Sequence, residues 1–174
     1  IEAHALAQGA DDDADDNDDD TVVPANEDEG DDTAPDVEDE PQALVMALEG
    51  TARSETMTVS AGHIGLLRGM LGNDRLNGAE LADALYGDGG NDYLVGGAGA
   101  DYLSGGDGAD RLYGGEGDDG LSGGTGNDYL YGDAGDDVME GGDGNDYLYG
   151  GAGADLMSGD EGHDRLYGQA GDDE

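Results

Sequence analysis

Aspartates recur at every ninth position through the second part of this 174-residue chain, each inside a glycine-rich stretch. Carboxylate oxygens and the carbonyl oxygens of a glycine-rich backbone are hard ligands, so the chemistry that they offer together is the binding of cations. Because the spacing recurs many times, we expect several cation sites in a row. The candidate metal ligands are Asp74, Asp83, Asp92, Asp101, Asp110, Asp119, Asp128, Asp137, Asp146, Asp155, Asp164 and Asp173.

The available ligands favour calcium over other divalent cations. Calcium accepts many oxygen ligands in a flexible arrangement, whereas magnesium tolerates fewer protein ligands and keeps its waters. Zinc would need clustered Cys or His side chains. The chain has no Cys, and its histidines, His4, His63 and His163, are scattered. The sequence therefore predicts multiple bound Ca²⁺ ions.

The aspartates belong to a nine-residue unit that begins at Gly69 and recurs to the last residue. In GGAGADYLS and GGTGNDYLY the first and fourth residues are Gly, the sixth is Asp and the eighth is Leu. Glycines at this density permit positive φ angles, so we expect a tight loop over the first six residues. The last three are predicted to form a strand whose eighth position, Leu or Met in every complete unit, points inward. A short fixed period predicts a solenoid.

The solenoid geometry places the aspartates in columns. If two units complete one coil, aspartates that are 18 residues apart stack, and the chain has two such columns. Neighbours in a column then lie about 4.8 Å apart, which is one strand spacing. At an effective dielectric constant near 20, each pair of carboxylates repels by about 3 kcal/mol. Since the core has only one Leu or Met per unit, we expect folding to require a cation between the carboxylates.

Over residues 69–174 the units resemble the G-G-x-G-x-D-x-U-x nonapeptide of the RTX (repeats-in-toxin) family of haemolysin-type calcium-binding repeats. The resemblance implies a parallel β-roll, a solenoid similar to a β-helix, in which the sixth-position Asp side chains and loop carbonyls hold calcium. The resemblance also implies a substrate of type I secretion, which is unfolded in the calcium-poor cytosol and folds outside the cell. The resemblance thus implies a secreted, extracellular protein of bacterial type, with the type I secretion machinery as a partner.

Some units depart from the pattern. The unit at residues 78–86 has Leu81 in place of the fourth Gly and lacks Gly at its second position, which argues against a site on that loop. Asp88, Asp133 and Asp160 replace the second Gly, and we expect them to distort their turns or to add charge near a site. Further acids at the third and fifth positions are interpreted as solvated, with an outer-sphere role beside a cation as the alternative. Among them are Asp107, Asp118, Asp136, Asp143 and Asp172.

Two segments precede the repeats. Residues 1–41 contain runs of Asp, three Pro and few large apolar residues, so we expect a disordered acidic linker. Residues 42–68 are richer in Leu, Val, Ile and Met and are predicted to form strands or a cap that covers the first repeat. A short helix over residues 42–48 is the alternative. Residues 69–174 form the third segment, the β-roll.

The net charge of −40 excludes binding to nucleic acid and to anionic membranes, which need cationic side chains. No apolar stretch is long enough to span a membrane. The absence of Cys fits a secreted protein that does not depend on disulfides. Because the last repeat stops before its hydrophobic position, we expect the chain to be a piece of a longer protein.

Tyrosines gather on one predicted face of the roll. Tyr113, Tyr131, Tyr149 and Tyr167 are 18 residues apart, so they should form one ladder on the outside of one sheet. Tyrosine favours exposed strand positions and stacks on its neighbours across strands, which is one explanation of the pattern. The other is a contact surface for a carbohydrate, a partner domain or another roll.

Three classes of function are compatible with these features. The leading hypothesis is a calcium-binding module that folds on binding extracellular calcium and supports secretion and stability. The second is a structural or adhesive protein of a surface layer or matrix. The third is a non-catalytic accessory of a secreted protease or lipase. The chain has no H-E-x-x-H or G-x-S-x-G motif and no Lys, so we expect it not to be an enzyme by itself.

Overall fold

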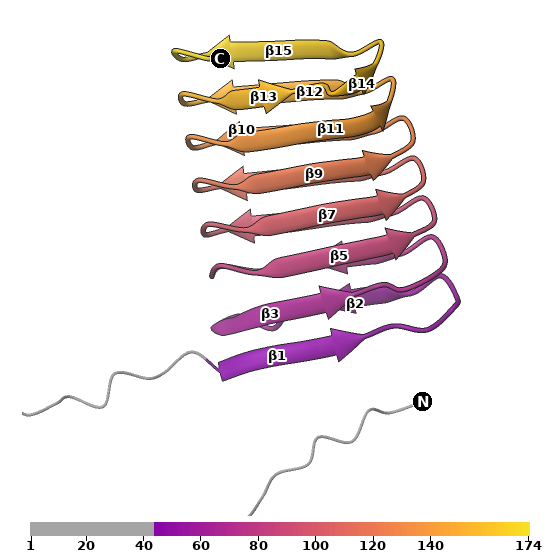
Figure 1. Ribbon diagram of the computed structural model, residues 1–174. Helices are drawn as coiled ribbons and strands as arrows, with labels where there is room; N and C mark the ends of the chain where they lie inside the picture. The colour runs from indigo at the N-terminus through magenta and orange to yellow at the C-terminus, as the bar shows by residue number, and fades with distance from the viewer. Residues whose placement is uncertain (1–43) are drawn as a thin grey trace, which may run out of the picture. The chain divides into compact units, whose positions relative to one another are not determined.

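The structure is a computed structural model that describes residues 44–174. Apart from β13 and β14, which share a sheet, successive strands alternate between two parallel sheets, and each strand pairs with a strand one coil away (Figure 1). The all-β parallel roll is therefore confirmed. The predicted disordered linker at residues 1–41 lies outside the described residues. No helix in the described part is long and apolar enough to cross a membrane.

The strands divide between the sheets in chain order. The eight-stranded sheet contains β1 (Leu44–Glu49), β3 (His63–Arg68), β5 (Ala84–Gly89), β7 (Tyr102–Asp107), β9 (Gly120–Thr125), β11 (Val138–Gly144), β13 (Leu156–Ser158) and β14 (Glu161–Gly162). The seven-stranded sheet contains β2 (Thr56–Thr58), β4 (Arg75–Asn77), β6 (Tyr93–Ala98), β8 (Arg111–Glu116), β10 (Tyr129–Ala134), β12 (Tyr147–Ala152) and β15 (Arg165–Ala170).

Most strands are longer than the sequence pattern predicts. We expected a strand only over the last three residues of each unit, but β6 and β8 each have six residues and run into the first three positions of the next unit. The expectation was wrong because the glycines do not end the pairing. Gly97, with a φ of 119°, pairs with Gly115 of the next coil, and Ala98 pairs with Glu116.

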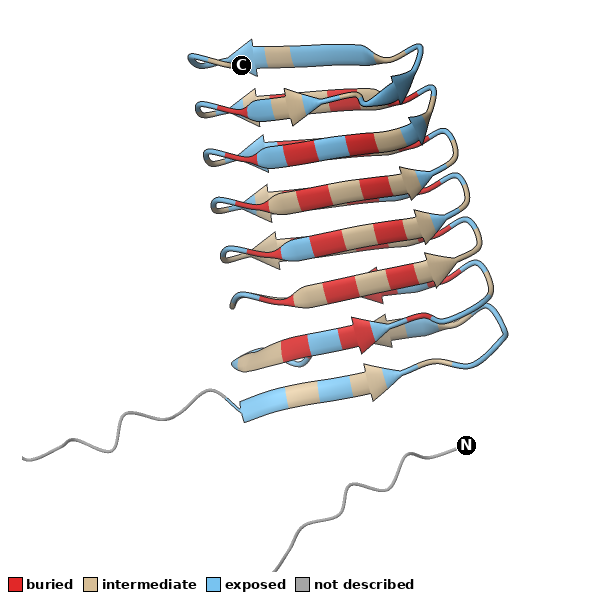
Figure 2. Cartoon of the chain, in the orientation of Figure 1, coloured by how far each residue is buried: buried red, intermediate tan, exposed pale blue. Residues whose placement is uncertain are grey.

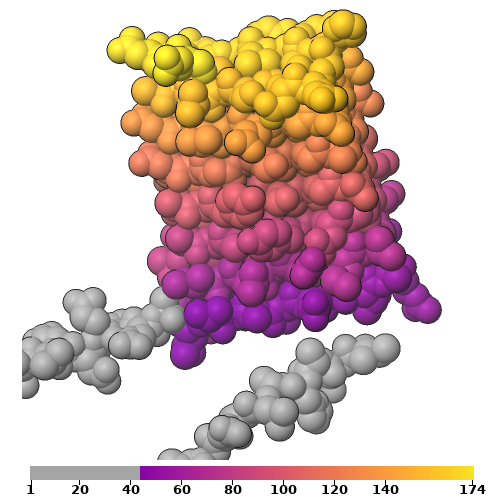
Figure 3. Space-filling view, in the orientation of Figure 1, coloured from indigo at the N-terminus to yellow at the C-terminus, as the bar shows by residue number. Residues whose placement is uncertain are grey.

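The core is a single file of side chains between the two sheets. The eighth-position residues from Leu76 to Leu148 are at most 2% exposed, which confirms that this position points inward (Figure 2). In the outermost strand β15 the equivalent Leu166 is 43% exposed because no coil covers it. Figure 3 shows the side chains of successive coils in continuous contact over the visible face. Each coil is therefore stabilised mainly by the coils next to it.

Residues 44–68 form the first coils of the same solenoid. Strand β1 pairs in parallel with β3, and β2 pairs with β4. The alternative of a helix over residues 42–48 is wrong for its described part, because Leu44 to Leu48 lie in β1. In the β2–β4 register Thr56 pairs with Arg75, so Glu55 lies beside Asp74. This coil was not recognised in the sequence because the register offset is 19 residues here and 18 in later coils.

The predicted tyrosine ladder is present on the seven-stranded sheet. Ring centroids are 4.7 Å apart for Tyr113 and Tyr131 and 4.9 Å apart for Tyr131 and Tyr149, with planes within 4° of parallel. Tyr149 stacks in the same way on Tyr167. Because the ring faces cover one another, the ladder stabilises the stacking of coils.

Candidate metal centre

The sixth-position aspartates form the two columns that a two-unit coil predicts. In one column the backbone N–H of Asp92 donates to Oδ1 of Asp110 at 2.7 Å, and the N–H of Asp110 donates to Oδ1 of Asp128 at 2.8 Å. The other column has the same contacts, for example from the N–H of Asp101 to Oδ1 of Asp119 at 2.7 Å. One oxygen of each of these carboxylates is thus held by the backbone of the preceding coil, which fixes the direction of the other.

The second carboxylate oxygen is buried and has no hydrogen-bond donor in most units. An unpaired buried oxygen is costly, and nearly all such atoms in proteins have a partner. The orphaned atoms are Oδ2 of Asp74, Asp92, Asp101, Asp110, Asp119, Asp128, Asp137, Asp146 and Asp155. This repeated deficit is the strongest sign that the columns are built to bind a positively charged partner.

A first-position glycine leaves open space next to each orphaned oxygen and one backbone carbonyl oxygen. A Cβ added to Gly141 would lie 2.6 Å from Oδ2 of Asp146 and 2.9 Å from the carbonyl oxygen of Gly159 in the next coil. The carboxylate and the carbonyl therefore converge on space that any larger residue would fill. Carboxylate and carbonyl oxygens are the ligands that calcium prefers, so the residues present fit this ion. We call this arrangement the oxygen cradle.

Side chains alone do not complete a site. Within residues 44–174 no three acidic or histidine side chains group closely enough to hold a metal ion. Each coil contributes one carboxylate to a column, and the backbone carbonyls must therefore supply further ligands. Asp164 and Asp173, in the last coil, belong to the columns and accept N–H groups from Asp146 and Asp155, but they are only half-buried.

Burial favours the protonated form of the column carboxylates. Loss of hydration raises the pKa of Asp110 to about 7 and the pKa values of Asp101, Asp119, Asp128 and Asp137 to about 6. The backbone N–H bond to each carboxylate opposes this shift, and the neighbouring carboxylates of the column add to it. A cation beside Oδ2 would reverse the balance, since it favours the ionised form.

The irregular loop at residues 78–83 differs from the others. Asp83 stands in its column, and its Oδ1 accepts the N–H of Gly65. Its Oδ2, however, accepts the backbone N–H of Ala79 at 2.8 Å. Asp83 is thus the one column aspartate, among those with a fully buried side chain in the described coils, whose second oxygen has a donor.

Asp at the second position does not distort the turn in the way expected for Asp88 and Asp133. Both have left-handed φ angles, 67° and 73°, and both keep their pairing, with Gly106 and with Gly115 respectively. The turns are not distorted because an aspartate can adopt the glycine conformation at small cost. The other alternative, charge added near a site, is confirmed: burial is the main cause of the raised pKa values of Asp92 and Asp119, and the charges of Asp88 and Asp133 add to it. At Asp160, with a φ of 60°, the strand is interrupted between β13 and β14.

The fifth position has a structural role that the sequence reasoning missed. Oδ1 of Asp118 accepts the N–H of Asp136 at 2.9 Å, and Oδ1 of Asp136 accepts the N–H of Ala154 at 2.7 Å. Asn73 and Asn127 cap the loops of the next coils in the same way. Asp118 and Asp136 are exposed, as expected of solvated side chains, but each also holds the backbone of the next coil. The recurrence of Asn and Asp at this position was the signal.

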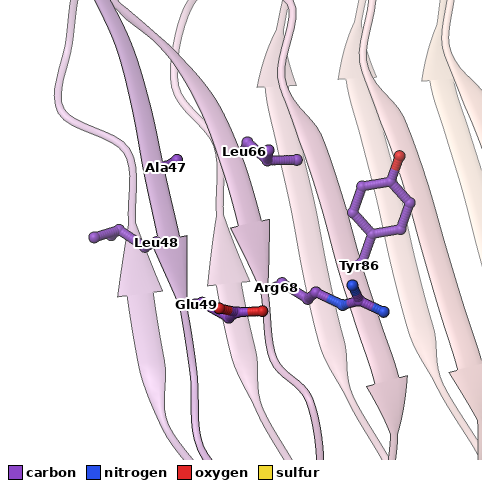
Figure 4. Close-up of a pocket in the computed structure, with 6 residues that line it drawn as sticks. All are labelled: Ala47, Leu48, Glu49, Leu66, Arg68 and Tyr86. Atoms are coloured by element: carbon purple, nitrogen blue, oxygen red, sulfur yellow. The ribbon is translucent and has the colours of Figure 1, made fainter.

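A hollow on the outside of β1, β3 and β5 differs from the aspartate columns in its lining. It has a volume of about 450 Å³ and is lined by Ala47, Leu48, Glu49, Leu66, Arg68 and Tyr86 (Figure 4). Arg68 also pairs with Asp88, at 2.6 Å. The hollow is mostly apolar and contains none of the column aspartates, so it is separate from the metal centre.

The comparison with protein families agrees with the geometry of the columns. The family model of the RTX calcium-binding nonapeptide repeat matches four times, at residues 86–121, 113–148, 122–157 and 140–174. These matches together span residues 86–174, which is just over half of the chain. No curated protein matches the chain. The chain therefore belongs to the family of RTX calcium-binding nonapeptide repeats and binds several calcium ions through them.

Proposed function

We propose that the repeats are a folding module that is unfolded at low calcium and becomes a rigid β-roll when calcium is present. The observation that carries this proposal is the set of nine buried Oδ2 atoms without a donor. Without a cation, the folded chain must bury these carboxylates unpaired or protonate them. The unfolded chain avoids both costs because water solvates every carboxylate.

The chain's own residues would hold calcium in the oxygen cradles. The sixth-position carboxylate contributes Oδ2, and the first-position glycine of the next coil contributes its carbonyl oxygen, as for Asp146 and Gly159. Bound calcium supplies positive charge that neutralises the column. Each column aspartate also contacts the backbone of the preceding coil through Oδ1. Ordering one loop thereby orders the next, and we expect calcium binding to be cooperative.

We further propose that this coupling serves secretion through a type I pathway and stability outside the cell. Membership of the RTX family and the net charge of −40 support this role, because the charge disfavours the compact state until cations bind. The role is one of binding and folding and not of catalysis. It would supply a calcium-stabilised segment to an extracellular protein, whatever the activity of neighbouring domains.

The test is far-UV circular dichroism of the whole chain during a calcium titration, with magnesium at equal concentration as the control. The proposal predicts a sharp, cooperative transition from coil to β-structure with calcium and no such transition with magnesium. A β spectrum that is already complete in the presence of a calcium chelator at neutral pH would overturn it.

A further inference from the structure

The backbone at the second position of each loop separates the carboxylates that lack a donor from those that have one. Gly106 has a φ of 106° and Gly142 a φ of 99°, and the non-glycine residues Met70 and Asp88 are left-handed as well. In each of these loops the column aspartate has an orphaned Oδ2. The same holds for all nine orphaned carboxylates of the described coils, whichever residue occupies the second position.

The loop of Asp83 differs from these loops both in its second-position backbone and in having a donor for Oδ2. Its second residue, Ala79, is not left-handed, and the Ala79 N–H points to Oδ2 of Asp83 at 2.8 Å. The cradle itself is retained, since a Cβ on Gly78 would lie 2.6 Å from Oδ2 of Asp83. A peptide N–H therefore supplies the donor that Oδ2 lacks in the other loops.

The first coil repeats this arrangement with a different residue. Glu55 lies beside Asp74 in the register, and its Oε2 accepts the N–H of Thr51 at 2.8 Å. Thr51 is the second residue of its loop and, like Ala79, is not left-handed. A Cβ on Gly50 would lie 2.5 Å from Oε2 of Glu55, so the carboxylate occupies the same cradle.

The column that contains Asp83 ends, toward the N-terminus, at a position where an apolar side chain replaces the carboxylate and the ion. Gly65 precedes Leu66, which pairs with Ala84, so Gly65 stands where Asp83 stands one coil later. The side chain of Val59, which is 3% exposed, fills the space beside it, and a Cβ on Gly65 would collide with Cγ2 of Val59. The carboxylate and the space for an ion are both absent here.

We infer that the second-position backbone decides whether a loop carboxylate is available to calcium, and that Asp83 and Glu55 are satisfied by the protein and are not calcium ligands. This inference rests on the proposed function. One column accepts calcium from Asp74 onward and the other from Asp101 onward. In the coils before them, Thr51 and Ala79 donate to the carboxylate and Val59 fills the space, so these coils need no calcium ion of their own.

The test is the number of calcium ions bound per chain at saturation, measured by equilibrium dialysis with radioactive calcium on the whole chain. Asp83→Asn should bind as many ions as the wild type, whereas the matched variant Asp101→Asn should bind fewer. Asparagine keeps one acceptor oxygen at both positions, so the hydrogen bond between coils is preserved, while at Asp83 the N–H of Ala79 loses its acceptor. The double variant Ala79→Gly/Leu81→Gly restores the regular loop and should bind about one additional ion.

Adding Asp83→Asn to the double variant is the control, and it should abolish the gain. Circular dichroism in saturating calcium confirms that each variant is folded. The inference is overturned if Asp83→Asn loses an ion in the same way as Asp101→Asn, or if the folded double variant gains none. A wild-type chain that binds no calcium at all would instead refute the proposed function.

Discussion

Substitution of a first-position glycine tests the oxygen cradle without removing a carboxylate. In Gly123→Ala the new Cβ would lie 2.5 Å from the carbonyl oxygen of Gly141 and 2.6 Å from Oδ2 of Asp128. Gly123 has no left-handed φ, so the alanine backbone is not strained. Ordinary contacts of a Cβ begin near 3.4 Å, so each oxygen must move away from the new Cβ by almost 1 Å.

Overpacking of this kind costs about 1–3 kcal/mol. We expect this cost to appear as a calcium affinity that is roughly 5-fold to 150-fold weaker at that coil. The assay is the midpoint of the calcium titration followed by circular dichroism. Gly120→Ala, in the same strand, is the control, because its Cβ would make only ordinary contacts, 3.4 Å from Cδ2 of Tyr102 and 3.9 Å from the carbonyl oxygen of Asp101. A Gly123→Ala midpoint equal to that of the wild type, or equal losses in both variants, would refute the cradle.

Three further predictions follow from other contacts. Because burial raises the pKa of Asp110 to about 7, the calcium-free folded form binds protons more tightly than the unfolded chain. This stabilisation is complete below a pH of about 4 and is lost as the pH rises to about 7. Circular dichroism in a chelator should therefore show more β-structure at acidic than at neutral pH. The opposite order would contradict the pKa shift. Tyr131→Thr removes two stacked pairs and should destabilise the calcium-bound form by about 1–3 kcal/mol in thermal unfolding. The loss should exceed that of Tyr102→Thr, which removes one tilted pair. Equal losses in the two variants would show that the ladder has no stabilising role. Asp118→Ala should lower the calcium-bound stability by about 1 kcal/mol while Asp118→Asn should not, since asparagine can accept the same N–H; a loss in both would point to the charge instead.

The fold was largely predictable because the sequence repeats its chemistry at a fixed period. Inward Leu at the eighth position and Asp at the sixth define a coil of 18 residues, and the contacts from Asp92 to Asp110 and from Asp110 to Asp128 follow that spacing. The length of the strands was not predictable, because the pairing of Gly97 with Gly115 depends on backbone angles that glycine leaves open.

The differences between individual sites were less accessible from the sequence. The sixth-position residue is Asp in the loops of both Asp83 and Asp101, yet only Asp83 receives an N–H at Oδ2. That distinction depends on the peptide orientation before Ala79 and not on the identity of the carboxylate. The first coil was hidden because one extra residue between β2 and β3 changes the offset, and because Glu55 and Gly65 stand where the motif has its sixth-position Asp.

The most direct test of the central claim is anomalous diffraction from crystals of the chain grown in calcium. An ion is predicted beside Oδ2 of Asp110 and the carbonyl oxygen of Gly123, which converge on the bare Cα of Gly105. Equivalent ions should recur along both columns from coil to coil. Calcium found only at exposed acids such as Asp107, with the buried Oδ2 atoms of the columns free of ions, would contradict the account.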